Sequence, residues 1–198
     1  MNEKLESILN GLKGKLNAVN IYQIIDGINA HAPIYAWRLG LGPLVGKYIM
    51  IVTQINHKTG NPVKTALEFF ELNGIKYVSN LAGCQQPWYR NLMANPRVTI
   101  QTADGTEQMV AVTVDQDDEM IQIIEWLLNR NAKAINQYMT ANNLQLTRKD
   151  ILKNKQDLIF LRFDPTSEPT PHGLEVDLAW IWPLMLIWVW FTKPKRRR

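Results

Sequence analysis

Two short segments gather side chains that could bind an anionic ligand. The first, residues 57–64, reads HKTGNPVK and supplies two lysines, a hydroxyl, a glycine and several backbone N–H donors. Cations and backbone N–H groups both favour anions, so a loop of this kind could hold a phosphate. The pattern is also typical of a solvated turn with exposed lysines, and the segment alone favours that simpler interpretation.

The second segment, residues 79–92, reads SNLAGCQQPWYRNL and passes from the end of a predicted strand into a short helix. It places a hydroxyl, a glycine, amide side chains and the flat ring of Trp88 close together. Glycine-rich turns and helix N-termini favour anionic groups, and an aromatic ring can stack on a ring-shaped cofactor. Trp88 and Leu92 are four residues apart, so they could equally form the buried face of the helix.

Composition excludes several other functions. Five of the 22 Lys and Arg residues lie within residues 193–198, so the rest of the chain is close to neutral and no basic face predicts a nucleic-acid partner. Cys84 is the only cysteine, and no Cys/His spacing predicts a metal site. The N-terminus lacks the apolar run of a secretory signal, so we expect a reducing, intracellular compartment.

The elements that must position these segments form a mainly β, α+β pattern. Asn73-Gly74 and Ala103-Asp104-Gly105 each predict a tight hairpin turn. The glycine-rich residues 40–46 predict an entry loop. Strands are predicted at 47–54, 64–72, 75–80, 97–102, 107–114 and 157–163, and helices at 87–94, 118–130 and 132–142. About six antiparallel strands with peripheral helices predict a small closed or split β-barrel.

With these motifs, the chain resembles the deazaflavin-dependent nitroreductases, a family of the FMN-binding split-barrel superfamily. The resemblance covers roughly residues 34–163. It begins with YAWRLGLGP at 35–43, continues through KTGNP at 58–62, and is strongest in WYRNLMANPRV at 88–98. It implies a reductase that uses the reduced deazaflavin coenzyme F-420 to pass a hydride to a quinone or a nitro compound. In such enzymes the protein supplies binding, orientation and water exclusion, and the cofactor carries the chemistry.

The resemblance also implies roles for individual residues. Lys58, Thr59 and Gly60 would contact the phosphate and tail of the coenzyme, and Lys64 would add charge. Ser79 would lie beside the deazaflavin ring, and Tyr138 would face the substrate. The implied catalytic residues are Ser79 and Tyr138, and the implied cofactor-binding residues are His57, Lys58, Thr59, Gly60, Lys64, Ser79, Asn80, Trp88 and Asn91.

The chain departs from the family pattern at several positions of this site. The family usually has an arginine where His57 stands, another near Val63, a proline at Ala66 and a lysine at Asn80. Fewer cations hold a polyanionic tail less firmly, which leaves FMN as the alternative cofactor. A flavin-, haem- or lipid-binding module without turnover is the alternative function.

Both ends of the chain extend beyond the predicted barrel domain of residues 34–165. Residues 1–33 include an apolar stripe from Leu5 to Val19, which predicts an amphipathic helix for docking or for a homodimer. Residues 166–198 form a linker and a tryptophan-rich, basic tail. Its stretch 178–191 has fourteen apolar residues without a charge, about 21 Å of helix against a bilayer core of about 30 Å.

The composition of this tail predicts contact with a membrane. Tryptophan favours the membrane interface, and the terminal cations favour an anionic leaflet. We therefore expect residues 174–198 to form a peripheral or shallow anchor at the cytoplasmic face of the cell membrane. A short transmembrane span, or packing of the tail on its own domain or a partner subunit, are the alternatives.

Overall fold

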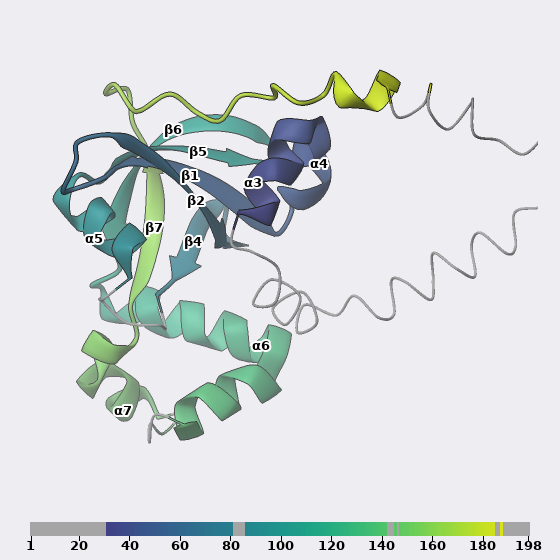
Figure 1. Ribbon diagram of the computed structural model, residues 1–198. Helices are drawn as coiled ribbons and strands as arrows, with labels where there is room; N and C mark the ends of the chain where they lie inside the picture. The colour runs from purple at the N-terminus through teal and green to yellow at the C-terminus, as the bar shows by residue number, and fades with distance from the viewer. Residues whose placement is uncertain (1–30, 81–85, 142–144, 146, 185–186, 188–198) are drawn as a thin grey trace, which may run out of the picture.

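In the computed structural model of the protein, residues 31–80, 86–141, 145, 147–184 and 187 are described (Figure 1). The amphipathic helix predicted between Leu5 and Val19 lies outside these residues, as does most of the basic tail.

Seven antiparallel strands form one sheet in the order β2-β1-β5-β6-β7-β4-β3, and β2 also contacts β4, which curves the sheet into a split barrel. The strands are β1 (Ile49–Ile55), β2 (Pro62–Glu68), β3 (Phe70–Leu72), β4 (Ile75–Ser79), β5 (Arg97–Thr102), β6 (Gly105–Thr113) and β7 (Phe160–Pro165). The predicted fold class is confirmed. There is one strand more than expected because the predicted strand 64–72 is interrupted at Phe69, whose N–H bonds to the carbonyl of Tyr48 instead.

Both predicted hairpin turns are present. Asn73 and Gly74 join β3 to β4 with φ values of 54° and 77°, a conformation that asparagine and glycine tolerate best. The second turn joins β5 to β6, where Thr102 pairs with Gly105. These turns fix the register of the strands that they connect.

The barrel interior is filled by apolar side chains from every second strand residue. Along β1, Met50 and Val52 pack in the interior cluster, whereas Ile51 packs outside the barrel with Trp37 and Leu174. The helix α5 (Pro87–Ala94) contributes the fully buried Leu92 to the interior. The interior cluster consists of Met50, Val52, Val78, Leu92, Val98, Ile100, Met109, Ala111, Leu161 and Phe163.

A long helix covers the barrel beside β4 and β7. The helix α6 (Asp117–Ala141) is kinked at Asn131, where φ is −152°, which agrees with the two predicted helical stretches on either side. Tyr77 of β4 donates its hydroxyl hydrogen to Glu119 of α6 at 2.9 Å, and Arg162 of β7 binds the same carboxylate at 3.0 Å. Burial, together with this hydrogen bond, raises the pKa of Tyr77 to about 12.

Two helical segments between α6 and β7 were not predicted. The helix α7 (Arg148–Lys153) begins after Thr147, whose side chain accepts from the N–H of Asp150. A three-residue 3₁₀ helix, η2 (Lys155–Asp157), leads from it to β7.

The prediction that residues 40–46 form an irregular entry loop is wrong for most of the segment, which is helical. Short helical segments occupy the region: α3 (Ala32–Ala36), η1 (Trp37–Leu41) and α4 (Gly42–Val45). Gly40, with φ of 83°, kinks the chain within η1, and Pro43 in the first turn of α4 starts a helix rather than breaking one. The ring of Trp37 lies against Gly42, where a Cβ would come within 2.9 Å of it.

The C-terminal segment returns across the barrel. Residues 166–178, which we call the strap, cross the outer face of the sheet towards α4 (Figure 1). The buried amide of Gln101 on β5 donates to the carbonyl of Leu174 at 2.9 Å and accepts from its N–H at 2.6 Å. Arg38 binds Asp177 through two hydrogen bonds, which lower the pKa of that carboxyl.

Beyond the strap, the chain stays in contact with η1. At the end of the strap, the N–H of Leu178 donates to the backbone carbonyl of Arg38 at 2.9 Å. Further on, the indole N–H of Trp182 donates to the carbonyl of Leu39 at 2.7 Å. Up to Trp182 the tail therefore packs on its own domain, as one of the alternatives expected. Within the described residues, no helix combines the length and the apolar character that crossing a membrane requires.

Candidate cofactor site

The loop that joins β1 to β2 is a closed turn built around Asn56. The side-chain oxygen of Asn56 accepts from the N–H groups of Lys58 at 2.9 Å and Thr59 at 3.1 Å, and its carbonyl accepts from Gly60 at 2.8 Å. Gly60 has φ of 71°, which a larger residue would adopt only under strain. Asn56 was not among the predicted site residues, although an asparagine in a loop often bonds the backbone two residues further on, as Asn56 does with Lys58.

The turn uses its own backbone donors. The N–H of Asn61 bonds to the hydroxyl of Thr59 at 3.3 Å, and the N–H of His57 bonds to the amide oxygen of Asn91 at 3.0 Å. With the bonds to Asn56, every backbone N–H from His57 to Asn61 has a partner inside the protein. The expectation that backbone donors would hold a phosphate is therefore wrong, and the groups left for an anion are the exposed side chains of His57, Lys58 and Thr59.

Asn91 connects this loop to α5. The side chain is buried, with 3% exposure, and its oxygen accepts from both the backbone N–H and the ring Nδ1 of His57, at 3.0 and 2.7 Å. Asn91 thus positions the loop. Trp88, one turn earlier on α5, is half-buried against the interior cluster and meets Tyr89 edge-on at 6.0 Å. Trp88 therefore has both a core-packing role and an accessible part.

The end of β4 brings two further candidate residues together. Ser79 is exposed, whereas Asn80 is 2% exposed and its N–H bonds to the carbonyl of Ile159 at 2.8 Å. Both polar atoms of the Asn80 side chain are buried without a hydrogen-bond partner. A buried amide in that state is costly, and a ligand that offers one donor and one acceptor would satisfy it.

These groups fit the chemistry of F-420. The exposed Lys58, His57 and Thr59 can meet an anionic tail, and Trp88 supplies an aromatic surface, whereas the unpaired amide of Asn80 is buried at the end of β4. Three segments provide them: the 56–61 loop, the end of β4 and α5.

Lys64 is placed away from this site, and the role predicted for Tyr138 stays a prediction. Lys64 is exposed on β2 in register with Thr53, and its charge contributes to lowering the pKa of Asp177 on the strap. Tyr138 lies in the second half of α6, and its side chain is outside the described part. The described part of the chain contains no cluster of three or more His, Cys, Asp or Glu side chains that could hold a metal ion.

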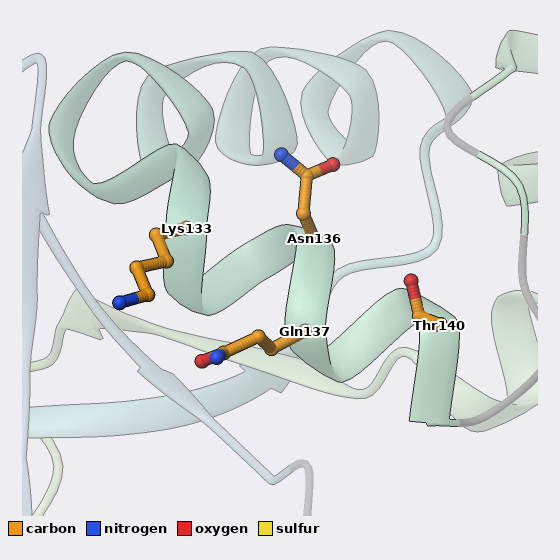
Figure 2. Close-up of a pocket in the computed structure, with 4 residues that line it drawn as sticks. All are labelled: Lys133, Asn136, Gln137 and Thr140. Carbon is orange, nitrogen blue, oxygen red and sulfur yellow. The ribbon is translucent and has the colours of Figure 1, made fainter.

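The second half of α6 borders an open hollow of about 540 Å³ (Figure 2). Its lining residues come from one face of this helix and are all polar. A flat cofactor is usually held between apolar walls from several elements, so this hollow is a poor site for one. The lining residues are Lys133, Asn136, Gln137 and Thr140.

Several solved structures are similar to this chain. They include an F420-H2 dependent reductase, FDR-A (20% identity, TM-score 0.42, 60% of this chain and 95% of that chain). A putative pyridoxamine 5'-phosphate oxidase from Listeria innocua matches with 13% identity and a TM-score of 0.41, over 64% of this chain and 90% of that one. The heme storage protein HutZ from Vibrio cholerae matches with 18% identity and a TM-score of 0.43, over 76% and 99%. No curated protein is significantly similar in sequence.

The part of the sequence that contains the candidate site matches a known protein family. The pattern described as F420H(2)-dependent quinone reductase matches residues 38–147, more than half of the chain. The matched region contains the 56–61 loop, the end of β4 and α5. The resemblance to deazaflavin-dependent reductases is thereby confirmed, with reduced F-420 as the reductant of the family and a quinone as its substrate. The chain belongs to the F420H(2)-dependent quinone reductase family of enzymes.

Proposed function

We propose that this protein binds reduced F-420 between the 56–61 loop, the end of β4 and α5, and passes a hydride to a quinone at the membrane surface. Reduced F-420 supplies the hydride and one proton, so the quinone becomes a hydroquinone and no other reductant is needed. A nitro compound is a second class of hydride acceptor for the same site.

The residues of the chain bind and orient the reactants. Lys58 and the hydroxyl of Thr59 hold the anionic tail, and Asn80 pairs with the polar edge of the ring system. Trp88 covers part of the ring and excludes water, and Ser79 places a hydroxyl beside the reacting face. The observation that carries this assignment is the family match over residues 38–147, which contain all five residues, and the buried, unpaired amide of Asn80 agrees with a polar ligand near the end of β4.

An anaerobic titration followed by turnover tests the proposal. We expect the full chain to quench the fluorescence of F-420 with micromolar affinity, and FMN to bind more weakly. Adding a water-soluble quinone to the complex with reduced F-420 should restore the absorbance of oxidised F-420. Binding of FMN alone would change the cofactor, and binding of F-420 without oxidation by any quinone would favour the module without turnover. Faster oxidation by a nitro compound would change the acceptor.

Exposed apolar side chains near the strap support the membrane location. Trp180, Leu184 and Ile187 are 60%, 54% and 52% exposed, and Leu44 of α4 is 68% exposed. Three of these residues lie within eight positions of the tail, and a surface region rich in exposed apolar side chains is typical of an interaction site. The cations of residues 193–198 supply the charge that an anionic leaflet attracts.

Co-sedimentation with vesicles tests this location. We expect the full chain to bind vesicles that contain anionic lipid, and to bind less at high salt because the attraction is screened. Replacing Trp180 and Leu184 by serine should weaken binding. Replacing Met93, which is exposed on α5, should not. Equal binding by both variants would contradict the assignment of the contact surface, and no binding to anionic vesicles would contradict the membrane location.

A further inference from the structure

His57 is held by one acceptor at two of its donors. The amide oxygen of Asn91 lies 3.0 Å from the backbone N of His57 and 2.7 Å from the ring Nδ1. A backbone N–H can only donate, so the Asn91 atom that faces it must be the oxygen and not the nitrogen. That oxygen can only accept, so Nδ1 must carry a hydrogen. The backbone thus fixes the amide orientation, and the amide fixes the tautomer of the ring.

This tautomer determines what Nε2 can do. Nε2 lies across the ring from Nδ1, on an exposed residue at the edge of the loop. In the neutral ring it has a lone pair and can only accept, so it offers nothing to an anionic oxygen. In the protonated ring it donates, and the ring carries a positive charge. Because the backbone donors of the loop are already used, this proton adds the second cation to a loop that otherwise has Lys58 alone.

We propose that His57 is a proton-dependent contact for the anionic tail of F-420, and that Asn91 is the positioning residue that directs Nε2 towards it. The inference rests on the proposed function and concerns how the same site is regulated. Affinity for the tail should therefore be higher when the ring is protonated, at acidic pH, than when it is neutral, at alkaline pH.

Charged groups near the loop influence how readily the ring of His57 takes up its proton, and a bound anion changes their net effect. Nearby cations disfavour a second positive charge, and a bound anion reverses this, so tail binding and protonation of the ring are linked. Glu68 is at the far end of β2, opposite Ile49, and Arg97 is paired with Glu168. The charged side chains on the elements next to His57 are Lys58, Lys64, Glu68, Arg90 and Arg97.

The first test compares two ligands across pH. F-420 and the deazaflavin chromophore without its tail are titrated by fluorescence at pH 5.5 and 8.5, and the ratio of their affinities removes any titration of the chromophore itself. We expect this ratio to favour F-420 by about three- to tenfold more at pH 5.5. The pH dependence of this ratio should vanish in His57→Gln. It should also vanish in His57→Arg, which should bind F-420 tightly at both pH values. His172→Gln, at an exposed histidine on the strap, should keep it.

The second test reads the ring directly. Nitrogen-detected NMR of the histidine side chains in the free protein should show the Nδ1–H tautomer for His57 at high pH, and Asn91→Leu should abolish that preference. A ratio that does not change with pH, or an Nε2–H tautomer in the free protein, would overturn the inference while leaving F-420 binding intact. Failure of F-420 to bind at every pH would overturn the proposed function and this contact with it.

Discussion

The unpaired amide of Asn80 predicts a trade-off between stability and binding. Asn80→Leu replaces two buried, unsatisfied polar atoms by methyl groups of similar volume. The backbone bond from Asn80 to Ile159, at 2.8 Å, does not involve the side chain and should remain. We therefore expect the variant to be more stable than the wild type and to bind F-420 less tightly.

The magnitude follows from the cost of burying polar groups. Each buried donor or acceptor without a partner costs about 1–3 kcal/mol, and the burial of leucine is favourable. Repacking offsets part of this gain, so we expect the free energy of unfolding to rise by about 1–3 kcal/mol. In a protein of this size, each kcal/mol raises Tm by about 2–4 °C. Loss of a donor and an acceptor to the ring should weaken F-420 binding by about tenfold or more.

Urea denaturation and fluorescence titration measure the two effects separately. Asn136→Leu, on the exposed face of α6, is the matched control and should change stability by less than about 0.5 kcal/mol and leave binding as it is. A destabilised Asn80→Leu would refute the reasoning, because the amide would then have partners in the folded protein. A stabilised variant with unchanged F-420 affinity would separate Asn80 from the cofactor.

Three other predictions concern the loop, the strap and α6. Lys58→Ala should weaken F-420 binding about three- to tenfold in the same titration, whereas Lys153→Ala, on α7, should have no effect. Gln101→Leu removes both bonds to Leu174, so hydrogen exchange of that amide should become about ten- to a hundredfold faster, and an unchanged rate would contradict the role of the strap. Tyr77 has a pKa raised to about 12, against about 10 when unfolded, so the folded state keeps a proton that the unfolded state loses. The free energy of unfolding should therefore fall by about 1–2 kcal/mol between pH 9 and 11.5 in urea titrations, and by much less in Tyr77→Phe.

Local patterns in the sequence were sufficient for the barrel. Two-residue periodicity and turn signals such as Asn73-Gly74 determine strands through steric rules that act over a few residues. The helix α4 was missed because Gly42 was interpreted as a flexible residue. Its reason for being glycine is contact with the Trp37 ring, and a contact of that kind is a tertiary property.

The sequence pointed to the segments of the candidate site but not to how they are bonded to each other. The 56–61 loop and α5 were singled out because each carries a recognisable motif. It could not show that Asn91 is bonded to His57, since a partner 34 residues away depends on the fold. Nor could it show that the loop's backbone donors are satisfied internally. As a result, Asn91 was predicted to line the pocket, whereas its oxygen positions the loop.

The strap gives the exposed apolar residues of the tail a fixed relation to the barrel. Gln101 of β5 is hydrogen-bonded to Leu174, and Arg38 of η1 is hydrogen-bonded to Asp177. The chain is therefore held to the barrel domain at two positions just before Trp180. A membrane contact through that region would therefore orient the whole barrel, whereas a flexible linker would only hold it nearby. For an enzyme that reduces a lipid-soluble quinone, orientation decides whether the substrate can reach the site. If the strap has this role, Gln101→Leu should leave vesicle binding intact and slow the reduction of a quinone embedded in the vesicles, while reduction of a water-soluble quinone continues at the wild-type rate. Equal losses with both quinones would show instead that the strap supports the cofactor site itself.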